Sequence, residues 1–239
     1  MKPKSYSKED YSWWIDQAVN SAKQIAPFIL EHFHIKSVLD FGCAQGGWLS
    51  VFQGLGVEKI QGLDGKWVDT DDLLIPAESF SCQDLASYRH DPKEKFDLCI
   101  CLEVAEHLDN KCADILVSNL TSASELILFS AAVPEQGGQH HINERPPLYW
   151  KQKFNIKGFH QFDFLRAQFW KNEEIAWWYR QNIMIYSKIS LHEKLPALYK
   201  DFGGTHLIHP TAFSEKCMEL SIENISLKNL LKEAFKRVF

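Results

Sequence analysis

Long apolar runs are absent from this sequence. No stretch reaches the roughly 18 consecutive apolar residues that a membrane-crossing helix needs. The first residues, 1–5, are polar and lack the apolar segment of a signal peptide. We therefore expect no membrane partner and a cytoplasmic location.

Basic residues are outnumbered by acidic ones. The chain carries 26 Lys and Arg against 31 Asp and Glu, a net charge of -5. Proteins that bind nucleic acid usually neutralise its phosphates with a basic face. The balance therefore argues against nucleic acid as the main partner.

Paired cysteine motifs are also missing. The six cysteines include no CxxC pairs at zinc-site spacing. Three of them fall in apolar segments that we predict to be buried strands. We interpret the cysteines as reduced and mostly buried, with no role in a metal site or disulfide.

What is present is an ordinary globular composition. Of the 239 residues, 45% are apolar and 24% are charged. This length suits one full α/β domain with additions, and leaves little room for a second large domain.

A glycine-rich turn organises the N-terminal half. Residues 37–49, SVLDFGCAQGGWL, begin as an apolar run, break at Gly42 and resume as a sequence able to form a helix. This order is typical of a buried parallel strand followed by a helix whose first N–H groups face a ligand. The small residues Gly42, Ala44 and Gly46 would let a ligand approach the backbone. The turn therefore predicts a nucleotide-type cofactor site.

Strands and helices are expected to alternate around this turn. The predicted strands are 37–42, 57–63, 79–83, 96–102 and 125–133, and the main predicted helices are 10–33, 47–55 and 109–123. Such alternation indicates βαβ units and a doubly wound, mostly parallel sheet.

The remaining segments add to this core. We expect a helix opening at Pro146 and Pro147, and two strands at 158–165 and 181–189 that form an antiparallel pair at one edge. Pro27 should divide the first helix or open a second one. An apolar stripe in 227–238 predicts a packing helix.

Acidic residues help to identify the cofactor. The pattern Gly42-x-Ala44-x-x-Gly47, followed by Asp64, resembles a degenerate dinucleotide fingerprint. However, Asp40 could orient the N–H groups of the turn but would repel a pyrophosphate. Asp84 follows the third predicted strand, and the turn contains no Lys or Arg to neutralise phosphates. These features favour an adenosyl ligand that carries positive charge. Asp64 would bind its ribose hydroxyls and Asp84 its adenine amino group.

The chain resembles the class I S-adenosylmethionine-dependent methyltransferases. Residues 38–46, Asp64, 83–85 and 96–108 look like that family's first four motifs, in the expected order, with Ala44 where glycine is commoner. The resemblance implies a Rossmann-like α/β fold, with a seven-stranded sheet whose last strand is antiparallel. It also implies S-adenosyl-L-methionine as cofactor, bound by Asp40, Gly42, Cys43, Ala44, Gly46, Asp64, Gln83, Asp84, Leu85, Leu102, Glu103 and His107.

The same resemblance suggests one methyltransferase domain over residues 1–239. Its parts would be an N-terminal helical lid at 1–34, a core at 35–190 and a C-terminal extension at 191–239.

Later segments resemble a narrower subgroup. Residues 129–144, 147–150 and 177–182 look like bacterial methyltransferases that act on small molecules or saccharides. This resemblance implies a small-molecule acceptor, with a hydroxyl of a sugar or secondary metabolite favoured. The protein would act as a monomer or homodimer. The alternatives are N-methyl transfer, a non-catalytic S-adenosylmethionine-binding scaffold, or an NAD-dependent oxidoreductase.

A base is needed if the acceptor is a hydroxyl. His107 follows the fourth predicted strand, and His140, His141 and Glu144 follow the fifth. Histidine has the right unperturbed pKa for this task near neutrality. We favour His141 over His140 and His107, and a loop held only by hydrogen bonds is the structural alternative. Both loop histidines with Glu144 would also suit a metal, but we expect none.

Acceptor binding is predicted for several larger side chains. We assign Glu144, Tyr149, Trp150 and Trp14 to this role, because aromatic rings line pockets for sugars and flat metabolites. The alternative is that most of these rings belong to the core.

Overall fold

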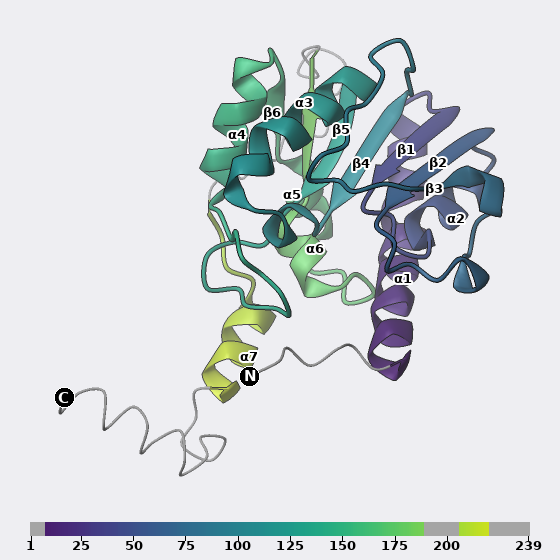
Figure 1. Cartoon of the computed structure of the whole chain (residues 1–239). Coiled ribbons are helices and arrows are strands. Elements are labelled where there is room, and N and C mark those ends of the chain that lie inside the picture. Colours follow the sequence, from purple (N-terminus) through teal and green to yellow (C-terminus); the bar gives the residue numbers. More distant parts are fainter. Residues whose placement is uncertain (1–7, 189–205, 220–239) are drawn as a thin grey trace, which may run out of the picture. The chain divides into compact units, whose positions relative to one another are not determined.

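The computed structural model describes residues 8–188 and 206–219, which fall into two units. The first unit runs to His206 and contains a seven-stranded sheet in the order β3-β2-β1-β4-β5-β7-β6, with helices packed against it (Figure 1). Its strands are β1 Ser37–Phe41, β2 Lys59–Asp64, β3 Phe80–Cys82, β4 Leu98–Leu102, β5 Leu126–Ser130, β6 His160–Phe162 and β7 Met184–Ser187.

Six α-helices of the first unit are described. They are α1 Lys8–His32, α2 Gly47–Gly54, α3 Ala113–Ala123, α4 Pro147–Ile156, α5 Phe164–Phe169 and α6 Trp177–Asn182. Short 3-10 turns lie at Thr70–Asp72, Ala77–Ser79, Ala105–His107 and Asn110–Cys112. The second unit, from Leu207, contributes α7, Pro210–Glu219.

The sheet is parallel from β3 to β5 and antiparallel at its other edge. β1 pairs in parallel with both β2 and β4, while β7 runs antiparallel to β5 and to β6. The predicted doubly wound, mostly parallel sheet is confirmed. The predicted edge pair is confirmed as well, although helices take up the ends of the segments 158–165 and 181–189.

Alternating side chains of the strands form two apolar layers. In β4, Leu98 and Ile100 join the layer that contains residues of α1, α2, α5 and α6. Cys99 and Cys101 join the opposite layer, with residues of α3 and α4. A central parallel strand is covered on both faces, so it reads as a continuous apolar run. This explains why these two cysteines are buried.

Pro27 lies inside α1 and does not divide it, so that prediction was wrong. Pro27 is exposed, while its neighbours Ile25, Ala26 and Ile29 are fully buried. Proline removes one intrahelical hydrogen bond, and on the solvent side water can satisfy the carbonyl left over. The buried stripe keeps the helix continuous.

Some expectations fall outside what the structure describes. The helix predicted at 227–238 and most of the predicted extension at 191–239 lie in residues that it does not cover. Among the helices it does cover, none is long and apolar enough to cross a membrane.

Candidate active site

Gly42 begins the turn between β1 and α2, at the point where the strand order reverses. Its φ of +85° is in the left-handed region, and a Cβ placed there would lie 2.3 Å from Val104 Cγ2. Val104 follows β4, so only glycine lets the segments after β1 and β4 come this close. In open α/β sheets, ligands bind in the crevice outside the strand ends at this switch point.

Asp64 ties the glycine-rich turn to the end of β2. Its Oδ2 accepts a hydrogen bond from the Ala44 N–H (2.7 Å), and its Oδ1 accepts one from the Gly65 N–H (2.6 Å). The Trp67 indole also donates to this carboxylate. Burial raises the pKa of Asp64 to about 6, against these hydrogen bonds, which lower it.

Asp40 has a different place from the one expected. We expected it to orient the N–H groups of the turn, but Asp64 does this. Asp40 lies within β1, opposite Gly62 of β2 and Ile100 of β4, and is 3% exposed. Burial, followed by the charge of Asp64, raises its pKa well above the ordinary value.

The other predicted cofactor residues follow the parallel strands or lie in the turn. Asp84 is exposed after β3, and its carboxylate accepts from the Ala86 N–H (3.1 Å) and the Ser87 hydroxyl (2.8 Å). Gln83 is partly buried, and Cys43, Leu85 and Leu102 are buried. Carboxyl ends of parallel strands share one edge of the sheet, which brings these residues toward the glycine-rich turn.

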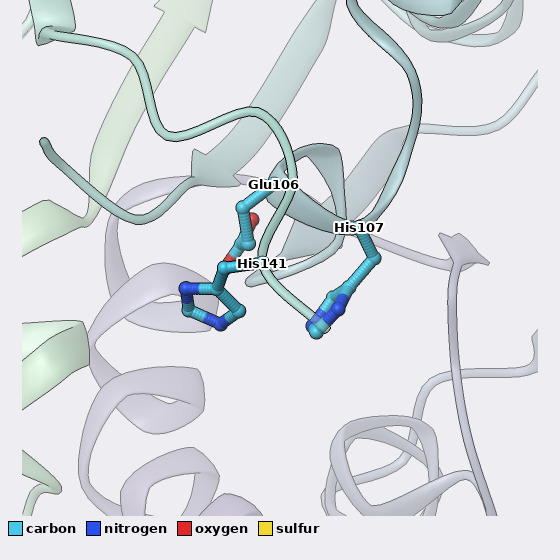
Figure 2. A group of neighbouring side chains, drawn as sticks. All are labelled: Glu106, His107 and His141. Carbon is cyan, nitrogen blue, oxygen red and sulfur yellow. The ribbon is translucent and has the colours of Figure 1, made fainter. Parts of the chain in front are cut away.

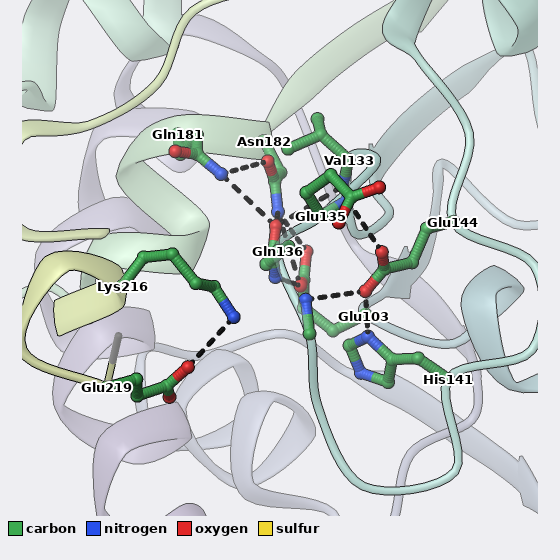
Figure 3. A network of polar contacts seen from close by, with 11 residues as sticks. Glu103, Val133, Glu135, Gln136, His141, Glu144, Gln181, Asn182, Lys216 and Glu219 are labelled. Atoms are coloured by element: carbon green, nitrogen blue, oxygen red, sulfur yellow. Dashed lines mark hydrogen bonds and ion pairs between the residues drawn. The ribbon is translucent and has the colours of Figure 1, made fainter. Parts of the chain in front are cut away.

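Glu103 stands at the end of β4 in a strained backbone conformation, with φ of +55°. Its N–H donates to the Ser130 carbonyl (3.1 Å), which fixes the turn to β5. Its carboxylate accepts from Asn182 Nδ2 (3.1 Å) and Gln136 Nε2 (3.2 Å) (Figure 3). Side-chain amides from α6 and from the loop after β5 therefore hold this acid, and burial raises its pKa.

Glu106 and His107 form the 3-10 turn that follows. Glu106 is fully buried, and within the part of the chain that the structure describes neither of its carboxylate oxygens has a hydrogen-bond partner. Burial and then the charge of Glu103 raise its pKa well above the ordinary value. Desolvation of the His107 ring, and then its neighbour His141, lower the pKa of His107 to about 4.

The loop after β5 carries His141 against this turn. Glu144 Oε1 binds His141 Nδ1 (2.9 Å) and also accepts from the Gly137 N–H (2.7 Å). The N–H groups of residues 142 and 143 both donate to the Glu106 carbonyl, at 2.9 and 3.0 Å. As a result the rings of His107 and His141 meet edge to face, with centroids 4.9 Å apart.

Two of the three histidines predicted as bases therefore lie together. His140 is exposed and takes a left-handed conformation, with φ of +63°. His141 is half-buried.

The aromatic residues predicted to bind the acceptor lie in three different environments. Trp150 is 2% exposed and packs against Phe129, so placing it on a pocket wall was wrong. Tyr149 is half-buried, and its hydroxyl donates to Asn110 Oδ1 (2.6 Å). Trp14 remains 42% exposed and packs against Trp178 of α6, with ring centroids 4.9 Å apart.

Several site residues had no role assigned from the sequence. Asn182 and Gln136 hold Glu103, and Gln181 Nε2 donates to Gln136 Oε1 (3.1 Å). Trp67 is 55% exposed although it contacts Asp64. An exposed tryptophan three residues after a strand-end acid was the one available signal.

The turn and the strand ends fit an adenosyl ligand. Any side chain at Gly42 would fill the space between the turn and Val104. Gly46, the N-cap of α2, has no side chain to bind the first N–H groups of that helix. A carboxylate has about four lone-pair sites, so Asp64 keeps acceptor capacity for a ribose in addition to its three donors. Neither Lys nor Arg occurs in residues 40–47 to hold a pyrophosphate.

Comparisons with known proteins agree with this geometry. The profile of a family described as "Methyltransferase domain" matches residues 15–180. No curated protein sequence matches the chain.

Solved structures share the fold at low sequence identity. The methyltransferase domain of bacterial CtHen1 is 16% identical, with a TM-score of 0.52 and coverage of 72% of this chain and 100% of that one. Magnesium protoporphyrin IX methyltransferase from Synechocystis PCC 6803, solved with S-adenosylhomocysteine, is 15% identical, with a TM-score of 0.51 and coverage of 72% and 84%. The mitomycin 7-O-methyltransferase MmcR is 10% identical, with a TM-score of 0.50 and coverage of 72% and 54%.

The family profile spans more than half of the chain, and it covers the turn, the strand ends and both histidines described above. The chain therefore belongs to the methyltransferase-domain family, among the class I methyltransferases that use S-adenosylmethionine as their cofactor.

Proposed function

We propose that this protein transfers a methyl group from S-adenosylmethionine to a hydroxyl of a small molecule, a sugar or a secondary metabolite. One observation carries the proposal: the His141–Glu144 pair lies beside His107 in segments that follow β5 and β4. A proton acceptor is needed there if the nucleophile is a hydroxyl.

S-Adenosylmethionine supplies a methyl group that is already activated by a positively charged sulfur. The protein must align the acceptor with that methyl group and remove the proton of the hydroxyl. Glu144 accepts the hydrogen bond of His141 Nδ1, which leaves Nε2 to take the proton. The Glu144 carboxylate then stabilises the imidazolium that results.

The residues that we propose to bind the cofactor lie at or just after the ends of the parallel strands. Asp64 would accept from the ribose hydroxyls, and Asp84 from the adenine amino group. Glu103, held by Asn182 and Gln136, would face the methionine end of the ligand. We add Trp67 as a ring against the adenosine, because it is exposed and contacts Asp64.

The acceptor class is supported by charge and by similarity. The net charge of -5 disfavours a nucleic acid. Two of the similar structures are named for a porphyrin and for mitomycin, both small molecules. Another, at 16% identity and a TM-score of 0.50, is the small RNA methyltransferase HEN1, so RNA belongs in the test.

The test measures S-adenosylhomocysteine formation with a cell metabolite extract, with isolated hydroxyl and amine acceptors, and with RNA oligonucleotides. Hydroxyl acceptors should give turnover. His141→Ala should lower that turnover by roughly 10²- to 10⁴-fold and leave S-adenosylmethionine affinity unchanged. The matched control His160→Ala, at an exposed histidine of β6, should change neither.

Other results would contradict the proposal. Turnover restricted to amines would make this an N-methyltransferase, and turnover restricted to RNA would replace the acceptor class. Cofactor binding without product under all conditions would favour a scaffold. Full activity of His141→Ala would move the base to His107 or His140.

A further inference from the structure

The turn after β4 and the loop after β5 bring together three groups that can bind a metal ion. One oxygen of Glu106 and one ring nitrogen each of His107 and His141 all lie within 4.8 Å of one another (Figure 2). In the picture the three side chains lie side by side, two from the turn and one from the loop. An ion with coordination bonds of about 2.0–2.2 Å needs ligand atoms roughly 3–4 Å apart, so the three side chains would move closer together to bind it.

Glu106 is the second, independent sign of a ligand. Its side chain is fully buried, and within the described chain neither of its oxygens has a hydrogen bond of ordinary geometry, although the backbone of Ala132 and the Glu103 carboxyl lie nearby. Buried polar atoms in native proteins nearly always have a partner, and an unpaired buried carboxylate is costly. A cation among these three residues would supply the missing partner.

Both histidines are oriented as metal-binding imidazoles usually are. A ligating histidine typically donates its second ring N–H to a carboxylate or to a backbone carbonyl. His141 binds the Glu144 carboxylate through Nδ1 (2.9 Å), and His107 has a hydrogen bond to the backbone of His140. Each ring thus has one nitrogen engaged and one remaining for an ion.

The surroundings keep this arrangement in place. The Glu106 carbonyl accepts from two consecutive N–H groups of the loop, and Asn143 Nδ2 donates to the Ala105 carbonyl (3.3 Å). Gly138 lets the His141 ring pack against its backbone, because a Cβ there would lie 2.3 Å from His141 Nε2.

We propose that Glu106, His107 and His141 bind a divalent transition-metal ion. Two imidazoles and one carboxylate suit Mn²⁺, Fe²⁺, Co²⁺ or Zn²⁺, and three protein ligands leave coordination positions open. This departs from our expectation of no metal, which considered His140, His141 and Glu144 and not Glu106 or His107.

A consequence follows for catalysis, and it rests on the proposed function. An open position on the ion would bind the acceptor oxygen and lower the pKa of its hydroxyl. His141 would then act as a ligand, and the acceptor hydroxyl, acidified by the ion, would release its proton to solvent water as the methyl group is transferred.

The experiment measures binding directly, without cofactor or acceptor. Full-length protein is stripped with a chelator, then titrated with Mn²⁺ and Zn²⁺ by calorimetry and with Co²⁺ by visible absorption. The wild type should bind one equivalent. Glu106→Gln, His107→Ala and His141→Ala should each weaken binding by at least 100-fold, and Glu144→Gln by roughly tenfold.

His160→Ala is the matched control for adventitious histidine binding and should bind as the wild type does. Circular dichroism of the metal-free variants checks that each is folded, and three separate ligand variants keep the test open if one is not. Absence of stoichiometric binding, or wild-type affinity in the folded ligand variants, would overturn the site. Because no methyl transfer is measured, the metal site and the proposed function can fail independently.

Discussion

Asp64 meets two opposing demands at the end of β2. It must stay ionised to hold the Ala44 and Gly65 N–H groups, yet it is only 4% exposed and its pKa is raised from 3.8 to about 6. Such a shift corresponds to about 3 kcal/mol of folding stability. Since the folded pKa is the higher one, that stability is fully present below pH 3.8 and is lost as the pH rises through 6.

This titration leads to a prediction for cofactor binding. Ribose hydroxyls donate to the ionised carboxylate, so the affinity for S-adenosylmethionine should fall as the pH drops below about 6, approaching tenfold per pH unit. Calorimetry from pH 5 to pH 8 measures it. Asp64→Asn should bind weakly and without this pH dependence, and a wild-type affinity that is flat down to pH 5 would contradict the ribose role.

Ala44 shows a related conflict within the turn. Its φ of +48° is left-handed, a conformation that costs a residue with a Cβ about 1 kcal/mol. The family's commoner glycine would avoid this strain. The hydrogen bond from Ala44 to Asp64 is what holds the residue there.

At the scale of elements, a buried ion pair at the start of α5 is tied to α6 by a hydrogen bond. Arg166 is fully buried and Asp163 is 1% exposed. Arg166 Nε donates to Asp163 Oδ1 (2.6 Å), Nη2 donates to Oδ2, and Nη1 donates to the Gln181 carbonyl (3.1 Å). We call these contacts of Arg166 the Arg166 brace. Because Asn182 follows Gln181, the brace also positions the Asn182 side-chain amide, which donates to Glu103.

Arg166→Ala should therefore destabilise the protein by about 3–5 kcal/mol, because it removes the cation that faces the buried Asp163 carboxylate. Urea unfolding measures the change. Lys36→Ala is the matched control: it breaks the exposed Lys36–Glu58 pair (3.2 Å) and should cost about 1 kcal/mol or less. Equal effects of the two substitutions would contradict the role of the brace.

At the scale of the molecule, three acidic residues lie at the carboxyl-end edge of the parallel strands. Asp64, Asp84 and Glu103 all stand at or just after strand ends. Residues 40–47 include no Lys or Arg. We therefore expect this edge to favour cationic over anionic ligands.

Ligand-dependent thermal unfolding should show this discrimination. S-Adenosylmethionine at 100 times its Kd should stabilise the fold by about 2.7 kcal/mol, which raises the Tm by roughly 5–10 °C. NADH at the same concentration should leave the Tm unchanged, because its pyrophosphate would face Asp64, Asp84 and Glu103 with no Lys or Arg in the turn. A larger shift with NADH would reverse the choice of cofactor.

Local patterns in the sequence were enough to predict the fold and to place the proposed cofactor residues at strand ends. A strand that is buried on both faces has a continuous apolar sequence, so a run such as 98–102 predicts a central strand by itself. Gly42 and Asp64 could be assigned because each directly follows or ends a strand. Parallel strands then bring such positions to one edge in any sheet of this order.

Contacts between distant segments could not be deduced in this way. Glu106 lies near His141, and Glu103 accepts a hydrogen bond from Asn182, 79 residues further on. Both contacts form only because the loop after β5 and α6 fold back over the strand ends. Trp150 enters the core for the same reason. The sequence by itself thus determined the elements and the cofactor class, through short-range patterning. Packing of the loops and α6 decided which polar side chains share the site, because that depends on the whole structure.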